Sequence, residues 1–140
     1  MRLRAAALVL AAFALVGCSA SVSLNIGGPA GAGTITFGTS TSGTDLVGQT
    51  GTFPVGATLS WRAVLSDNAN TSQLTLVFAQ QNATGDPQTI GTQTLPVKDT
   101  TSNLFTGTLD LSVTGVQAGT YVVSLTRDTT TLATGTFQVQ

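Results

Sequence analysis

Apolar and polar residues alternate through most of the chain. From about Thr52 onward, short stretches place every second residue on an apolar face, as in ATLSWRAVLS at 57–66 and SQLTLVFAQQ at 72–81. This period of two residues is typical of strands with one buried face. Clusters of turn-forming residues, SDNAN at 66–70 and NATGDPQ at 82–88, separate the stretches.

Further strands follow at a spacing of 8–15 residues. The stretch at 88–97 contains Gly91 and Pro96, which favours an edge position or a bulge. No helical period is present beyond the first 20 residues. About seven strands at this spacing predict an all-β domain over 52–140, an antiparallel sandwich of two sheets. The remaining predicted strands lie in 104–113, 120–127 and 131–140.

The alternation also assigns side chains to faces. Arg62, Val64, Val77 and Val122 are expected to point outward, and the three valines then form either ordinary surface or a small contact patch for a partner protein. The predicted core consists of Leu59, Trp61, Leu65, Leu74, Leu76, Phe78, Phe105, Leu109, Leu111, Tyr121, Val123, Leu125 and Phe137.

The first 17 residues have the pattern of an export signal. Arg2 and Arg4 precede an apolar run at 5–16, which is shorter than the ~20 residues of a membrane-spanning helix. A signal-peptide helix over 1–17 is therefore predicted. Two alternatives are ordinary cleavage after Ala20 and an uncleaved anchor.

The end of this segment resembles the lipobox of bacterial lipoproteins: Leu15, Val16 and Gly17 precede Cys18, the only cysteine. The resemblance implies that the Cys18 thiol receives a diacylglycerol and that the chain is cut before it. The new amino group is then acylated, so that lipid such as palmitate anchors the protein in a membrane of the cell envelope. Ser19 is similar to the pattern that sends lipoproteins to the outer membrane in bacteria with two membranes.

Between the signal and the predicted sandwich, residues 18–51 are rich in Gly, Ser and Thr, as in GGPAGAG at 27–33 and GTSTSGTD at 38–45. Such composition predicts a tether between lipid and domain. The alternating stretches SVSLNI at 21–26 and TITF at 34–37 are candidates for an additional edge strand.

Composition excludes several kinds of chemistry. Only 8% of residues are charged, the net charge is −1, and the chain lacks His. Nucleic acid is not an expected partner because no basic patch can be built. Without His, neither a Ser-His-Asp triad nor an ordinary zinc or copper site can form, and no cofactor is implied.

The stretch VQAGTYVVSLTRDTTTLATGTFQV at 116–139 resembles the last two strands of bacterial immunoglobulin-like and fibronectin-III-like domains. AGTY at 118–121 is similar to the corner before their penultimate strand. The resemblance implies that the Tyr121 hydroxyl bonds to nearby backbone and that Trp61 is a core residue. The cysteine pair that joins the sheets of antibody domains is absent.

Six aspartates carry the acidic charge. Asp67, Asp86, Asp99 and Asp128 fall in predicted turns, where an Asp side chain usually caps its own backbone, and Asp110 is expected to be solvated. A Ca²⁺ site that uses DNAN, with Asp67 as its carboxylate, is an alternative, but the D-x-D-x-D-G spacing is missing. Nothing selects a carboxylate pair for glycoside hydrolysis.

These observations predict a non-enzymatic lipoprotein that binds a partner in the envelope or has a structural role there. Its strand edges lack the lysines that normally block strand addition, since Lys98 is the only lysine. A second hypothesis is a protease inhibitor that presents the loops at 66–72 and 98–103. A third is an envelope enzyme that depends on Asp, which the missing His and Glu disfavour.

Overall fold

The computed structural model describes residues 32–112 and 116–140, and this part of the chain is all β. No helix able to cross a membrane occurs within these two ranges. The predicted signal peptide, Cys18 and the stretch at 21–26 lie outside the described residues. The described residues form nine strands: β1 (Gly33–Ser42), β2 (Asp45–Gln49), β3 (Thr52–Phe53), β4 (Thr58–Val64), β5 (Gln73–Gln80), β6 (Gln88–Pro96), β7 (Leu104–Asp110), β8 (Gly119–Arg127) and β9 (Thr130–Val139).

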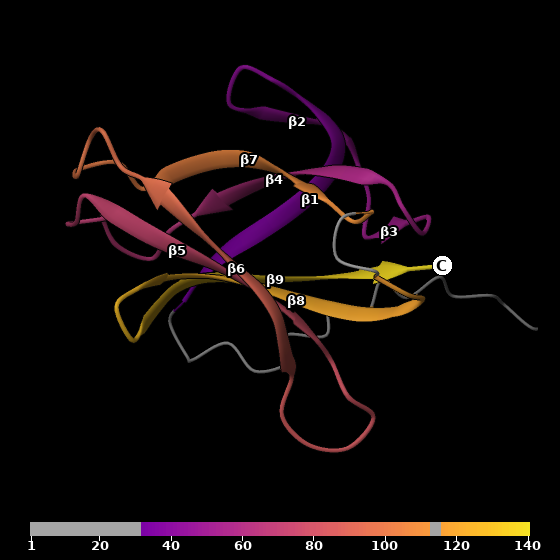
Figure 1. The fold of residues 1–140 in the computed structure, drawn as a ribbon. Helices are drawn as coiled ribbons and strands as arrows, with labels where there is room; N and C mark the ends of the chain where they lie inside the picture. The colour runs from indigo at the N-terminus through magenta and orange to yellow at the C-terminus, as the bar shows by residue number, and fades with distance from the viewer. Residues whose placement is uncertain (1–31, 113–115) are drawn as a thin grey trace, which may run out of the picture.

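The strands form one continuous sheet in the order β6-β5-β8-β9-β1-β4-β7, with β2 paired to β1 and β3 paired to β9. The predicted pair of antiparallel sheets differs from this arrangement, because β1 pairs with β4 and also with β9 and so joins the two halves. The sheet is also mixed, since β9 runs parallel to both β1 and β3. It curls around the core, with β1, β4 and β7 facing β5, β8 and β9 (Figure 1).

The junction of β1 and β9 depends on a close approach of two backbones. A Cβ atom at Gly135 of β9 would collide with the carbonyl oxygen of Ile35 in β1. Only glycine lets the strands come this near. The alternation of apolar residues contains no information about such a contact, so the junction was not predicted.

The predicted tether contains two strands in its described part. β1 lies inside the sheet rather than at its edge, and its side chains Ile35 and Phe37 are each 4% exposed. β1 and β2 form a hairpin in which Ser42 pairs with Asp45. Most of the Ser- and Thr-rich stretch at 38–45 thus belongs to an exposed hairpin, in which the threonines favour a strand.

The predicted core is largely confirmed. Eleven of the thirteen side chains are buried, whereas Phe105 and Leu109 are only partly buried because β7 is the last strand of the sheet. Residues in β1, β3, β4, β9 and the loops complete the cluster. The core members missing from the predicted set are Ile35, Phe37, Phe53, Ala63, Ala69, Val97, Val116, Leu132, Ala133 and Val139.

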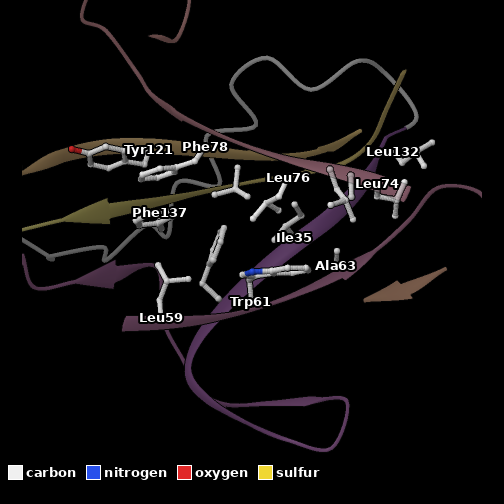
Figure 2. Packing of buried hydrophobic residues seen from close by; sticks show 14 of the residues in the cluster. Ile35, Leu59, Trp61, Ala63, Leu74, Leu76, Phe78, Tyr121, Leu132 and Phe137 are labelled. Atoms are coloured by element: carbon white, nitrogen blue, oxygen red, sulfur yellow. The ribbon is translucent and has the colours of Figure 1, made fainter. Parts of the chain in front are cut away.

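Phe137 is the centre of an aromatic cluster. Its ring lies 5.0 Å from that of Phe37 and 5.8 Å from that of Phe53, in edge-on geometry, and it stacks on Tyr121 at 5.6 Å and Phe78 at 6.0 Å. Figure 2 shows Phe78, Tyr121 and Phe137 of this cluster between the strands, together with Trp61. Aromatic pairs at such distances stabilise a core beyond simple burial of area.

The outward valines do not form the exposed patch considered above. Val122 is 7% exposed, and Val64 and Val77 are of intermediate exposure. In the described ranges, the large exposed hydrophobic residues are Val47 in β2 and Val55 before β4. A contact patch of Val64, Val77 and Val122 is therefore not available.

Candidate functional site

The two loops predicted as binding loops lie side by side at one end of the sheet. We call residues 65–72 and 97–103 the loop cluster. Four backbone hydrogen bonds of 2.8–2.9 Å join its two segments, so that the loops support each other. The Leu65 amide donates to the carbonyl of Asn103, and the Ala69 amide donates to that of Ser102. The Asn70 amide donates to the carbonyl of Thr100, and the Val97 amide donates to that of Ser72.

Arg127, at the end of β8, fixes the loop cluster to the sheet. Its Nη1 atom donates hydrogen bonds to the carbonyl oxygens of Asn68 at 3.3 Å and Ala69 at 3.0 Å. Ser66 contributes a further link, because its backbone N–H and its hydroxyl both donate to the carbonyl of Leu132. The loop cluster is therefore a preorganised surface rather than a pair of loose connections.

Two of the four aspartates predicted to cap turns, Asp67 and Asp99, do so. Among the described residues, no hydrogen bond reaches the carboxylate of Asp86 or Asp128. The Oδ1 atom of Asp99 accepts hydrogen bonds from the Thr101 amide at 2.9 Å and the Thr101 hydroxyl at 2.6 Å. Asp67 accepts from the amide of Asn68 at 2.8 Å. The hydrogen bond from the Thr101 hydroxyl, and then that from its amide, lowers the pKa of Asp99 below its ordinary value.

Asp110 forms the same motif at the opposite end of the sheet. Its Oδ1 atom accepts from the amide of Ser112 at 2.9 Å and from the hydroxyl at 2.7 Å, and the latter bond has the larger effect in lowering the pKa of Asp110. Within residues 32–112 and 116–140, no three His, Cys, Asp or Glu side chains gather as metal ligands. The DNAN stretch therefore brings no further carboxylate to Asp67.

The corner before β8 has the geometry that the family resemblance implies. The Tyr121 hydroxyl donates to the carbonyl of Gln117 at 2.7 Å and accepts from the amide of Gln117 at 3.2 Å. Tyr121 itself is fully buried. One side chain thus satisfies both backbone groups of a loop residue and fixes the loop against the core.

Among the described residues, the main path of the sheet ends at β6 and β7, each of which pairs with a single strand. No residue of β6 is charged, and the only charged residue of β7 is Asp110 at its end. β6 also has a bulge, since Phe78 pairs with Gly91 and Ala79 with Thr89, which leaves Ile90 without a partner in the register. The predicted edge position and bulge of this strand are confirmed.

Sequence reasoning missed the residues that organise the loop cluster. The sequence pattern does not mark Arg127 as a residue that binds a loop, and the backbone carbonyls of 100–103 leave no signal in the side chains. One signal was available: Ala69 is a lone apolar residue inside a polar turn, and it is fully buried under Arg127.

No family model and no curated protein matches this chain. Among solved structures, it is similar to an immunoglobulin-like protein (PA1606) from Pseudomonas aeruginosa. The TM-score is 0.51 and the sequence identity is 20%, and the match covers 77% of this chain and 93% of that one. This similarity shows an immunoglobulin-like fold.

Two other structures are similar at lower TM-scores. The soluble domain of PmoD from Methylocystis sp. ATCC 49242 (Rockwell) has a TM-score of 0.43 and 17% identity, over 76% of this chain and 89% of that one. The superoxide reductase (neelaredoxin) from Ignicoccus hospitalis has a TM-score of 0.37 and 13% identity, over 65% and 74% of the two chains.

Proposed function

We propose that this protein is a non-enzymatic lipoprotein of the bacterial cell envelope, and that its immunoglobulin-like domain binds an extended segment of another envelope protein. Lipid on Cys18 anchors it, in the outer membrane where the bacterium has two membranes. The observation that carries the binding role is the outer edge of β6, nine residues without a charge that pair with no other described strand than β5. Such an edge presents unpaired N–H and C=O groups to a partner strand.

The position of Gly33 supports an orientation of the domain in which the loop cluster faces the membrane. A Cβ atom at Gly33 would collide with the carbonyl of Val64, next to Leu65 and Ser66, so the sheet begins at the end that carries the loop cluster. Fourteen residues lie between Cys18 and Gly33, and this length of chain can span at most ~50 Å. In this proposal the loop cluster faces the membrane, and the opposite end of the sheet faces away from it.

The lipid anchor is tested by the Cys18→Ala variant. The wild-type protein is expected to incorporate labelled palmitate and to sediment with membranes, while the variant does neither. Ser19→Ala serves as the matched control and keeps the label. Equal sedimentation of wild type and Cys18→Ala would exclude the anchor.

Binding at the edge of β6 is tested by adding a charge that opposes strand addition. In intact cells, chemical crosslinking of the wild type is expected to capture a partner protein, and Thr92→Lys in β6 is expected to reduce this product at least tenfold. Ser40→Lys, which adds the same charge on the exposed β1–β2 hairpin, is the control. A product of unchanged yield in Thr92→Lys would place the partner elsewhere.

A protease inhibitor is the second candidate function. The observation that favours it is the mutual support of the two segments of the loop cluster, because rigid loops bind with a smaller loss of entropy. A panel of secreted proteases separates the candidates: inhibition that is lost when residues 98–103 are replaced by Gly and Ser favours the inhibitor. An enzyme has less support, because the carboxylates of Asp99 and Asp110 cap their own turns.

A further inference from the structure

The core-facing side of β5 changes from apolar to polar at the last residue of the strand. Leu74, Leu76 and Phe78 point into the core and are almost fully buried, and the next residue on this face is Gln80. Its neighbours confirm the orientation, because Gln80 pairs with the fully buried Tyr121 in β8. A polar amide therefore occupies a core-facing position at the end of the sheet opposite the loop cluster.

Gln80 lies in a row of side chains that crosses three strands. On its other side it pairs with Gln88 in β6, so that Gln88, Gln80 and Tyr121 follow one another across β6, β5 and β8. Gln117 lies next to the Tyr121 end of this row, because its backbone N–H and C=O both form hydrogen bonds with the Tyr121 hydroxyl. Three carboxamides from three segments thus gather at the mouth of the curled sheet.

A cleft of about 440 Å³ opens at this mouth. Its volume is in the range of small-molecule sites. Buried Val116 and half-buried Ile90 form an apolar side of the cleft. Tyr121 forms another, fixed side. The lining residues, all uncharged, are Gln80, Gln88, Thr89, Ile90, Val116, Gln117 and Tyr121.

The three carboxamides have free hydrogen-bonding capacity. Among the described residues, no hydrogen bond involves the side chain of Gln80, Gln88 or Gln117. Each carboxamide offers an NH₂ donor beside a C=O acceptor, a pair that matches two neighbouring hydroxyl groups. An anionic ligand would find no cation in the lining, and a cation would find no carboxylate, so either charge would be desolvated without a partner.

We propose that this cleft binds a neutral saccharide. The carboxamides of Gln80, Gln88 and Gln117 bond to its hydroxyl groups, and Ile90 and Val116 contact its apolar ring face. The site requires neither the lipid anchor nor strand addition at β6, so its test is independent of the function proposed above.

The test uses the mature protein as cells produce it, purified in a detergent without a sugar headgroup. Maltotriose, cellotriose and tri-N-acetylchitotriose are titrated by calorimetry, with trigalacturonate as the anionic comparison. At least one neutral trisaccharide is expected to bind saturably, and trigalacturonate is not. Absence of saturable binding by all three neutral probes, or equally tight binding of trigalacturonate, would overturn the proposal.

Variants assign the binding to the cleft. Gln88→Ala and Gln117→Ala change exposed side chains, and each is expected to raise Kd about three- to tenfold, the loss of one or two neutral hydrogen bonds. Gln73→Ala, at the other end of β5, is the matched control and keeps the wild-type Kd. Gln80→Leu extends the row of apolar core-facing residues in β5 by one position. This variant is expected to abolish binding without lowering Tm. Unchanged Kd in all three cleft variants contradicts the assignment.

Discussion

Gly107 of β7 lies directly against the indole ring of Trp61, its cross-strand partner in β4. A Cβ atom at Gly107 would be 2.5 Å from Cζ2 and 2.8 Å from Cε2 of the indole. The glycine in the outermost strand thus provides the space in which the largest side chain of the core is 1% exposed. Since the buried Nε1 atom of Trp61 has no hydrogen-bond partner among the described residues, their packing holds the ring.

The first prediction concerns this contact. Gly107→Ala is expected to lower the free energy of unfolding by about 1–3 kcal/mol, because the added methyl group overlaps the indole in a packed core. Urea denaturation followed by Trp61 fluorescence measures the loss. The control is Gly91→Ala in the other edge strand, where a Cβ atom meets nothing within 4 Å. Equal stability of the two variants would contradict the packing argument.

The second prediction concerns the corner before β8. Tyr121→Phe keeps the ring that stacks on Phe78 and Phe137 but removes both hydrogen bonds to the backbone of Gln117. Stability is expected to fall by about 1–3 kcal/mol, since the backbone groups lose their partner. Thermal denaturation tests this, while an unchanged far-ultraviolet spectrum shows that the strands persist. A Tm equal to that of the wild type would mean that water replaces the hydroxyl.

The third prediction concerns the loop cluster. Arg127→Met retains an aliphatic chain but leaves the carbonyls of Asn68 and Ala69 without their donor. Amide hydrogen exchange of Ala69 and Asn70 is expected to accelerate at least tenfold, because these amides bond across to 100–103.

Arg62→Met is the matched control for this experiment. The Nε atom of Arg62 donates to the carbonyl of Thr44 at 3.0 Å, in the β1–β2 hairpin rather than in the loop cluster. Exchange of Ala69 and Asn70 should therefore remain at the wild-type rate in this variant. Acceleration in both variants would indicate general destabilisation instead of local release.

The fourth prediction concerns acid. Because the pKa values of Asp99 and Asp110 are lowered in the folded state, both carboxylates stabilise the fold above pH 3.8, the ordinary value. This contribution is lost as the pH falls through the lower folded-state values. Tm measured from pH 6 to pH 2 should fall less steeply in Asp99→Asn than in the wild type.

Asp86→Asn is the control for the acid series. No hydrogen bond to the carboxylate of Asp86 is present among the described residues, so this variant should follow the wild-type curve. A slope in Asp99→Asn that also equals that of the wild type would show that Thr101 does not stabilise the charged form of Asp99.

The sequence alone determined the strands from β4 onward and most of the core. Trp61, Leu76 and Val123 belong to stretches in which every second residue is apolar, and that period follows directly from the pleat of a strand with one buried face. The turn role of Asp99 was equally local, because an Asp side chain reaches the amide two residues ahead.

Only the tertiary structure decided how the strands associate. The insertion of β1 between β9 and β4 depends on a glycine contact between residues 100 positions apart, Ile35 and Gly135, which no local pattern records. The same holds for Arg127 on the loop cluster and for the row of Gln88, Gln80 and Tyr121. Alternation fixes which way a side chain points, whereas its neighbours depend on strand order, and strand order is set by packing across the whole core.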